Sequence, residues 1–257
     1  MRAESVLPST CEPASTWWFT QRPIDPPMPP PATTSLSIPG YLERVYWWAY
    51  IHPRAVRLFE REWLVNTILM GNYARLRDAM LNELGAQVGG DTLQVACVYG
   101  DFSNRLQQRL GPKATLDVID ILPIQLNNLT RKLPEHPRVT LRQNDSSALS
   151  AADASYDQVL LFFLLHEQPE AVRRATLSEA MRVVKPGGKV VLVDYHRPRW
   201  WHPARPLLWA VLRTLEPFAL DLWKHGLEAY LPQQRPATSI IKVTYFGAMY
   251  QKLVLTR

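Results

Sequence analysis

Cysteine is scarce in this chain, which contains only 2 among its 257 residues. Cys11 and Cys97 are too few and too far apart for a disulfide scaffold or a thiolate metal site. No apolar run approaches the roughly 18 residues of a membrane-spanning helix. The first residues, MRAESVLPSTCEP, lack the apolar core of a secretory signal. These absences predict a protein of the reducing cytoplasm.

Clustered positive charge is also missing, although the formal net charge is +6 and the isoelectric point is near 9.4. The basic residues are scattered, without a Lys/Arg-rich run, an aromatic RNA-binding motif or a target-base motif after the fourth strand. We therefore expect no nucleic-acid partner. An anionic lipid surface explains the same charge and stays open as a partner.

Prolines crowd the start of the chain, where the PPMPPP segment has neither backbone donors nor apolar periodicity. This composition predicts a disordered tail over residues 1–36, with a specific docking segment as the alternative. Residues 37–86 then show apolar and aromatic residues at helical spacing, from Tyr46 to Ile68. They predict aromatic N-terminal helices, the last of which ends at Gly85.

From residue 87 onward the pattern changes to strands that alternate with helices. Apolar strands are expected at residues 92–98, 114–119, 138–142, 158–163 and 189–193, and helices at 102–110, 123–133 and 170–184. The KPGG segment at 185–188 predicts a tight turn, and residues 199–231 a helical insertion. Two final strands meet at Gly247 and Ala248. The expected fold is a doubly wound, mostly parallel α/β sheet with an antiparallel C-terminal hairpin and a helical cap.

The turn after the first predicted strand lacks the residues of an ordinary nucleotide site. Such a turn usually carries an acid and several glycines, because the backbone must approach the ligand closely. Here Gln94, Ala96 and Val98 occupy those positions, and only Gly100 remains. We count Gln94, Ala96 and Gly100 as candidate cofactor-binding residues, although this segment alone favours a cofactor only weakly.

The next two strand ends strengthen the prediction of a cofactor site. Asp120 ends the second strand, where a carboxylate can accept hydrogen bonds from both hydroxyls of a ribose. Its alternative is to cap the helix that follows. Asp145 and Ser146 follow the third strand, where they can contact an adenine edge, with a simple Asx turn as the alternative.

Titratable residues follow the fourth and fifth strands. His166 and Glu167 end the former, and Asp194 and His196 the latter. His166, Glu167 and His196 are candidate catalytic residues. All four together predict a site of mixed imidazole and carboxylate ligands for a divalent metal such as manganese or iron. Structural hydrogen bonds that cap helices and stabilise turns are the alternative.

Several segments together resemble the rhodoquinone biosynthesis proteins, a divergent branch of the class I S-adenosylmethionine-dependent methyltransferases related to the ubiquinone and menaquinone enzymes. The resemblance rests on YWWAYIHPRAV, FEREWLVNTIL, LQVACVYGDF, LLFFLLHEQPE, RVVKPGGKVVLVDYH and VDYHRP, and runs from Tyr41 to Pro232. It implies a class I methyltransferase-like Rossmann fold. It also implies conversion of ubiquinone to rhodoquinone by exchange of a ring methoxy for an amino group, with S-adenosylmethionine as amino donor and manganese as metal.

The resemblance assigns Asp120 to the cofactor ribose and Asp145 to the acid after the third strand. Ordinary methyltransferases have an acid at the position of Gln94, and its negative charge favours the protonated amine of the bound methionine group. Gln94 is neutral and lacks this charge. Only the uncharged amine can attack a quinone. The aromatic helices suit a quinone ring or a bilayer interface. We accordingly expect ubiquinone and a membrane surface as partners, with peripheral association at the inner face of the energy-conserving membrane.

Two other functions remain open at this point. A conventional methyltransferase that acts on a polyprenyl quinone or quinol would transfer a methyl group and need no metal. A methyltransferase-like protein that binds without catalysis would explain the lost glycines by drift. The acids at Asp120 and Asp145 and the titratable strand ends argue against the second.

Overall fold

Seven strands form one sheet in the structure, a computed structural model that describes residues 36–257. Their order across the sheet is β3-β2-β1-β4-β5-β7-β6. The strands are β1 (Asp91–Val95), β2 (Thr115–Asp120), β3 (Val139–Gln143), β4 (Tyr156–Phe162), β5 (Val184–Tyr195), β6 (Ser239–Tyr245) and β7 (Tyr250–Thr256). Strands β1 to β5 pair in parallel, and β7 runs antiparallel to both β5 and β6. The doubly wound sheet with an antiparallel C-terminal hairpin is thereby confirmed.

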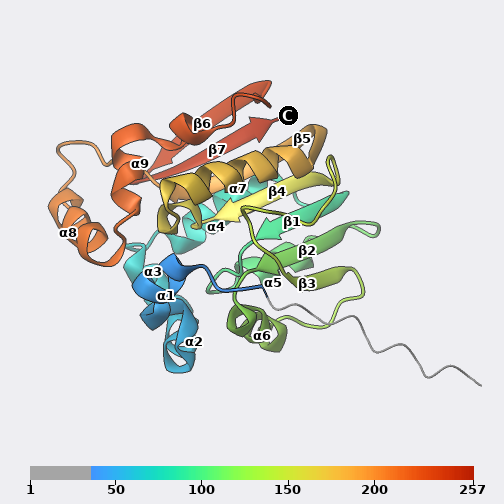
Figure 1. The fold of residues 1–257 in the computed structure, drawn as a ribbon, viewed down its shortest axis with the longest axis horizontal. Coiled ribbons are helices and arrows are strands. Elements are labelled where there is room, and N and C mark those ends of the chain that lie inside the picture. Colours follow the sequence, from blue (N-terminus) through green and yellow to red (C-terminus); the bar gives the residue numbers. More distant parts are fainter. Residues whose placement is uncertain (1–35) are drawn as a thin grey trace, which may run out of the picture. The chain divides into compact units, whose positions relative to one another are not determined.

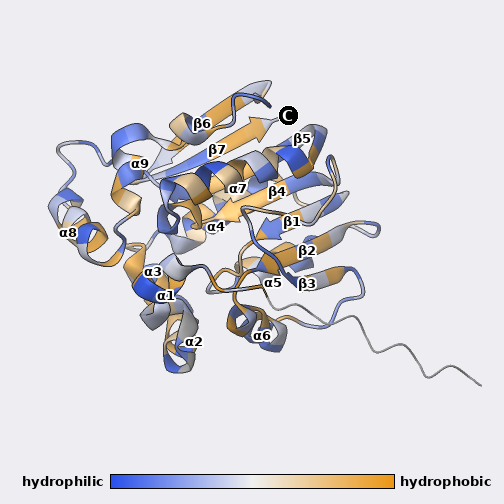
Figure 2. Ribbon diagram, in the orientation of Figure 1, coloured by the Kyte–Doolittle hydropathy of each residue, from blue (hydrophilic) through white to orange (hydrophobic). Residues whose placement is uncertain are grey.

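Both faces of the central strands are buried, which explains why their sequences are apolar at nearly every position. In β4, Leu160 and Phe162 pack with α4 and α5 on one face, whereas Val159 and Leu161 pack with α7 on the other. Figure 2 shows β4 as a mainly hydrophobic ribbon beside helices of mixed character. The helices are α4 (Tyr73–Glu83), α5 (Phe102–Gln108), α6 (Pro123–Lys132) and α7 (Glu170–Val183).

Short helices occupy the N-terminal segment, as its periodicity predicts. They are α1 (Gly40–Val45), the π-helical turn η1 (Trp47–Ile51), α2 (Pro53–Phe59) and α3 (Glu62–Ile68). Pro53 starts α2 at a position where a missing backbone N–H costs nothing. Gly85 follows α4 with a φ of 88°, consistent with the predicted end of that helix. The tail predicted over residues 1–36 lies, except for Leu36, outside the described residues.

The aromatic insertion is also helical. It contains α8 (Arg205–Leu215), α9 (Ala219–His225) and the 3-10 turn η3 (Leu227–Tyr230). Helices α1, α2, α3, α8 and α9 gather at the end of the sheet toward which the arrows of β1 and β4 point (Figure 1). This end carries the strand termini where ligands bind in open α/β sheets. We call α1, η1, α2, α3 and α8 the cap.

Within residues 36–257, no helix combines the length and the apolar character needed to cross a membrane.

Two boundaries differ from the sequence-based expectation. Strand β1 ends at Val95 instead of reaching residue 98, because Ala96 has a φ of 74° and leaves the extended conformation. The KPGG segment is part of β5, which begins at Val184. Gly187 still has a φ of 78°, and the pairing register between β4 and β5 shifts between Tyr156 and Gln158. The glycines therefore form an irregularity within a strand rather than a separate turn.

Candidate functional site

A cavity of about 720 Å³ lies between the carboxyl ends of the strands and the cap. Its sheet side consists of residues that end or follow β1, β2, β3 and β4, and its other side comes mainly from α1, η1, α2, α3 and α8. The volume lies within the range of small-molecule and cofactor sites, about 300–1,000 Å³. Most lining side chains are apolar, so the few polar groups decide what the cavity can bind.

The β1–α5 turn keeps a glycine-like backbone without the glycine. Ala96 lines the cavity with a φ of 74°, a conformation that a side chain disfavours and glycine tolerates. Gln94 supports this turn from below: its amide donates to the carbonyl of Ala96 at 3.0 Å and to Ser103 Oγ at 2.9 Å. Gln94 is buried and does not line the cavity, so the structure gives it a supporting position beneath the turn.

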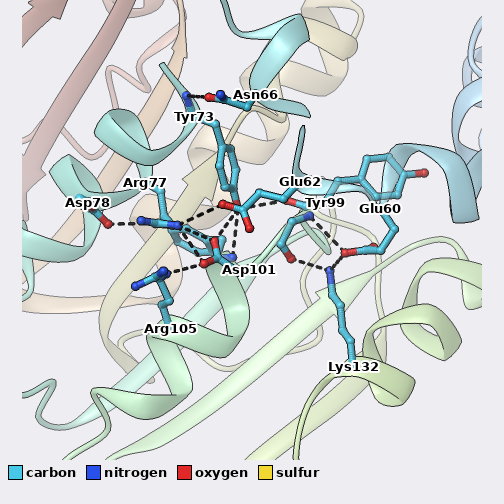
Figure 3. Close-up of polar contacts among 12 residues, drawn as sticks. Glu60, Glu62, Asn66, Tyr73, Arg77, Asp78, Tyr99, Asp101, Arg105 and Lys132 are labelled. Carbon is cyan, nitrogen blue, oxygen red and sulfur yellow. Dashed lines mark hydrogen bonds and ion pairs between the residues drawn. The ribbon is translucent and has the colours of Figure 1, made fainter. Parts of the chain in front are cut away.

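Gly100, the remaining glycine, lies outside the cavity lining and holds the turn against the cap. Its N–H donates to Glu60 at 3.2 Å, and Lys132 donates to its carbonyl at 2.9 Å while pairing with Glu60. A Cβ here would lie 2.5 Å from the Tyr73 hydroxyl, and the φ is 83°. Figure 3 shows this set beside a second one, in which Arg77 and Arg105 pair with Asp101. Only glycine fits between these groups.

Asp120 lies at the end of β2 and lines the cavity with its carboxylate almost fully buried. One oxygen accepts the N–H of Cys97 at 2.8 Å, and the other accepts the N–H of Leu122 at 2.9 Å. The bond to Leu122 closes a turn before α6, whose N-cap residue is Leu122 and has no side-chain cap, so the alternative of a helix cap by Asp120 is not borne out. Burial raises the pKa of Asp120 to about 6, although both backbone donors oppose the rise. Each oxygen keeps a lone pair for a ribose hydroxyl.

Asp145 and Ser146 line the cavity next to Asp120. Asp145 accepts from the backbone and hydroxyl of Ser147 at 2.8 and 2.7 Å, which is the Asx turn considered as its alternative. Ser146 Oγ lies 3.0 Å from Thr176 Oγ1 and accepts from Gln168 at 3.1 Å. The turn thus fixes both residues at the cavity wall. We call Ala96, Asp120, Asp145 and Ser146 the cofactor end.

His166 and Glu167 line the same cavity from the short turn η2 (Leu165–Glu167) after β4. Asp194, at the end of β5, holds this turn by accepting the N–H groups of Leu165 and His166 at 2.9 and 3.2 Å. Its other oxygen lies 2.9 Å from His166 Nδ1. This contact is electrostatic, because Nδ1 has no aligned acceptor. Burial alone would lower the pKa of His166, but the charge of Asp194 outweighs it and raises the pKa to about 9.

The cap adds further groups to this side. The Tyr50 hydroxyl donates to Glu167, whose carboxylate also lies 3.7 Å from His166 Nε2. Glu216, which follows α8, lines the cavity with Oε2 buried, and the buried hydroxyl of Tyr46 is its neighbour. Burial raises the pKa of both carboxyls, and the charge of His166 opposes the rise. We call Tyr50, His166, Glu167, Asp194 and Glu216 the acid cluster. It holds protons that exposed carboxyls would release at neutral pH.

Comparisons with known proteins agree with this geometry. Residues 92–188 match a sequence family described as a methyltransferase domain. The chain is 30% identical to a demethylmenaquinone methyltransferase of Staphylococcus aureus over 135 aligned residues. The alignment covers 52% of this chain and 55% of the relative. The chain thus spans about half the length of the curated relatives it matches.

Solved structures support the same assignment at the level of the fold. The N-methyltransferase NodS from Bradyrhizobium japonicum is 14% identical with a TM-score of 0.52, covering 71% of this chain and 93% of NodS. A SAM-dependent methyltransferase from Aquifex aeolicus is 18% identical with a TM-score of 0.50, covering 79% and 97%. The fold is that of a class I methyltransferase. At these identities the likeness concerns the fold alone.

The residues of this methyltransferase fold suit S-adenosylmethionine at the cofactor end. Ala96 keeps the turn conformation that brings backbone close to a ligand, and Asp120 presents a buried carboxylate to the cavity. Asp145 and Ser146, which the sequence predicts to contact an adenine, also line the cavity. The predicted cofactor-binding residues therefore divide: these four line the cavity, while Gln94 and Gly100 shape the turn from behind.

The predicted metal site is not formed. Three of its residues meet in the acid cluster, but His196 lies apart, with Nδ1 2.8 Å from the carbonyl of Ala248. Strand β5 ends at Tyr195, so the alternation that would align His196 with Asp194 stops before it. Within residues 36–257 no group of three or more His, Cys, Asp or Glu side chains is arranged to hold a metal ion. His196 does not line the cavity either, which separates it from the other catalytic candidates.

Sequence reasoning missed Tyr50 and Glu216 as site residues. Tyr50 was one of many aromatics in the N-terminal helices, and nothing local marks it as the partner of Glu167. Glu216 carries a signal in retrospect, because it is the one acid between Arg205 and Leu220 in an otherwise apolar segment. A single carboxyl in such a segment is costly to bury unless it has a function or a partner.

Proposed function

We propose that the chain converts ubiquinone to rhodoquinone, with S-adenosylmethionine as amino donor and an exchange of one ring methoxy for an amino group. The observation that carries this proposal is one largely apolar cavity whose lining includes both the cofactor end and His166, Glu167 and Glu216 of the acid cluster. A flat apolar ring fits between a nucleotide and buried proton donors. The curated relative, by its name, methylates a demethylmenaquinone, and this supports a quinone as the acceptor.

The cofactor end would bind S-adenosylmethionine, which supplies the amine when bound. Asp120 would accept the ribose hydroxyls, and Asp145 and Ser146 would contact the adenine. Between Gln94 and Gly100 the turn contains no carboxylate, and Asp101 beyond it is paired with Arg77 and Arg105. Because the turn supplies no carboxylate of its own, one charge that would favour a protonated amine is missing, although Asp120 and Glu60 accept N–H groups of the turn from outside it. The missing charge favours the uncharged, nucleophilic form of the amine.

The acid cluster would serve the quinone. Addition of the amine nitrogen to the methoxy-bearing carbon places negative charge on a ring oxygen, which a donor at His166 or Glu167 would stabilise. The C–N bond forms, the ring–methoxy bond breaks, and the methoxy leaves as methanol with a proton from this pair. The protons lost by the nitrogen return to it. We assign no step to a metal ion, because no group of three or more His, Cys, Asp or Glu side chains within residues 36–257 is arranged to hold one.

The bond between the nitrogen and the donor carbon must also break. The electrons balance if the donor carbon is oxidised by two electrons, which reduce the quinone ring, and if water then hydrolyses the resulting C=N bond and supplies a carbonyl oxygen. The quinone product emerges as the quinol, and the donor as the corresponding 2-oxo acid. Glu167 and His166 can move the protons between carbon, nitrogen and ring oxygen, because both groups hold a proton near neutral pH.

A labelling experiment tests this proposal. The full chain is incubated with ubiquinone and S-adenosylmethionine labelled either with ¹⁵N in its amine or with ¹³C in its methyl group, and the quinones are analysed by mass spectrometry. We expect ¹⁵N in the product, no ¹³C and one methanol per turnover. Methyl label on the ring would establish the second candidate, a conventional quinol methyltransferase, which the similarity to the Staphylococcus aureus relative favours. Absence of both labels would indicate a binding protein.

We also propose peripheral association with the inner face of the energy-conserving membrane, where a polyprenyl quinone resides. Leu58, Ile68, Leu207, Val211 and Leu215 line the cavity and are exposed. They form an apolar mouth between α2, α3 and α8. A long isoprenoid tail could leave through this mouth into lipid while the ring reacts inside.

A further inference from the structure

A second hollow, of about 600 Å³, lies beside the start of α8, outside the cavity described above. We call it the arginine–tryptophan groove. Its lining includes Arg197, Arg205, Lys224, Trp200, Trp209 and Trp223, and no carboxylate among the described residues. It combines three cations with three indoles on the outer side of the aromatic insertion.

Two of the three cations of this groove lack counter-ions among the described residues. Among residues 36–257, the side chains of Arg197 and Arg205 have no ion pair or hydrogen bond, and Lys224 has only Asp221 at 3.3 Å. Arg213 adds a further positive charge, stacked 5.1 Å from the ring of Trp209. Elsewhere in the fold, arginines such as Arg77 and Arg182 are paired with carboxylates. An unpaired cluster of cations attracts an anion from outside the chain.

The indoles indicate what kind of anion. Trp223 is nine-tenths buried at the groove, and its Nε1 donor has no partner in the described part of the chain. Trp200 is 82% exposed and Trp209 is 45% exposed. Exposed indoles next to cations favour the boundary between lipid headgroups and acyl chains. A phosphate alone explains the cations and the Trp223 donor, but it leaves the exposed rings unexplained.

Helix α8 connects the groove with the mouth of the cavity. Arg205 and Trp209, one helical turn apart, line the groove, whereas Leu207, Val211 and Leu215 line the cavity from another face of the same helix. A surface that covers the groove therefore lies beside the mouth.

We propose that the arginine–tryptophan groove binds the phosphate of an anionic phospholipid and so holds the cavity mouth against the bilayer. The phosphate lies between Arg197, Arg205 and Lys224 and accepts the N–H of Trp223, while Trp200 and Trp209 enter the interface. This inference deepens the proposed membrane association and rests on it for its biological purpose.

Vesicle flotation of the full chain tests the groove. One set of vesicles contains phosphatidylcholine alone, and the other contains phosphatidylcholine mixed with phosphatidylglycerol. We expect binding to the anionic set to fall roughly fivefold for each groove cation removed, about 25-fold in the Arg197→Gln/Arg205→Gln double variant. Trp223→Phe, which keeps the ring and deletes the donor, should weaken it about tenfold.

The matched control is Arg131→Gln/Arg142→Gln, which removes two exposed charges on α6 and β3, at the opposite edge of the sheet. It should bind as the parent does, within about twofold, since distant charges are screened. Circular dichroism and melting temperatures establish that each variant is folded, and Trp223→Phe provides a test that leaves the charges intact.

Three outcomes would overturn the proposal. An equal loss of vesicle binding in the groove variants and the control variant would show that binding depends only on the net charge of the protein. Equal binding of the parent to both vesicle sets, or to neither, would show that no headgroup is recognised. Displacement by inorganic phosphate, beyond that of chloride at equal ionic strength, would show a site for free phosphate. Because the measurement is binding, none of these results depends on which group the enzyme transfers.

Discussion

The cofactor end and the acid cluster differ in how their polar groups are paired. At the cofactor end, polar groups are already satisfied by the backbone: Asp120 accepts two N–H groups, and Asp145 closes its own turn. In the acid cluster, titratable groups instead face one another: His166 Nδ1 lies 2.9 Å from Asp194, and the Glu167 carboxylate lies 3.7 Å from His166 Nε2. The first arrangement fixes a shape for a ligand, whereas the second keeps protons available for chemistry.

The cofactor end and the acid cluster also differ in which parts of the fold supply their residues. The turn holds Ala96 in a conformation that glycine usually adopts, so a ligand-binding shape does not require the glycine. The acid cluster also includes Tyr50 of η1 and Glu216 after α8, which the sheet alone does not supply. If the proposed function holds, cofactor binding depends on the sheet, and acceptor chemistry depends on the sheet and cap together.

The sharpest way to separate the two ends is Glu167→Gln. Glutamine keeps the shape and can still accept from Tyr50, but it cannot carry the proton. We expect turnover to fall about 10²- to 10⁴-fold, the usual contribution of general acid–base catalysis. Binding of S-adenosylhomocysteine, measured by calorimetry, should be unchanged. Glu170→Gln, at a neighbouring exposed position on α7, is the control and should leave turnover as it is. Turnover within threefold of the parent would remove Glu167 from the reaction.

The reverse experiment is Asp120→Ala, which should act on the cofactor end alone. Loss of charge-assisted hydrogen bonds to the ribose should weaken cofactor binding by about 1.5–3 kcal/mol. Glu135→Ala removes an exposed carboxylate between α6 and β3 and should not affect it. Unchanged affinity in a folded Asp120→Ala protein would show that the ribose lies elsewhere.

Local sequence signals were sufficient for the sheet and for placing Asp120 and Asp145 at the cavity. Asp120 and Asp145 follow apolar strands directly, and the ends of parallel strands meet at one edge. The prediction that His196 joins the metal ligands was wrong for a local reason as well. Strand β5 ends at Tyr195, so the alternation of side chains along the strand does not extend to His196. The residues that lie nearest to the strands were therefore the predictable ones.

The acid cluster was only half predictable, because its cap members come from distant parts of the chain. Tyr50 lies 117 positions before Glu167, and no periodic pattern links a residue of a π-helical turn to the end of a strand. Glu216 reaches the cavity because α8 packs over it, which depends on tertiary packing. The left-handed φ of Ala96 was likewise invisible, since alanine rarely adopts it.

The pH dependence of cofactor binding offers a finer test of the same division. Ribose hydroxyls need the carboxylate form of Asp120, whose pKa is raised to about 6 by burial. Affinity for S-adenosylhomocysteine should therefore be constant above this pH and fall about tenfold for each pH unit below it, since the proton competes with the ligand. Asp120→Asn should bind more weakly and lose the dependence. A parent affinity that stays flat down to pH 4.5 would contradict the assignment.

The smallest expected effect concerns the alanine that replaced a glycine. A left-handed conformation costs an L-residue roughly 1–2 kcal/mol, while glycine loses about 0.5–1 kcal/mol more backbone entropy on folding than alanine. The difference favours glycine at position 96. Ala96→Gly should therefore raise the free energy of unfolding by about 0.5–1 kcal/mol.

Ala79→Gly, inside α4, is the matched control for that measurement. The same chemical change should there lower the free energy of unfolding by about 1 kcal/mol, because the backbone is helical and glycine gains nothing from it. Urea denaturation of both variants compares the two signs directly. If Ala96→Gly destabilised the protein as Ala79→Gly does, the turn would not hold Ala96 in a left-handed conformation. The cofactor end would then have changed its shape along with its sequence.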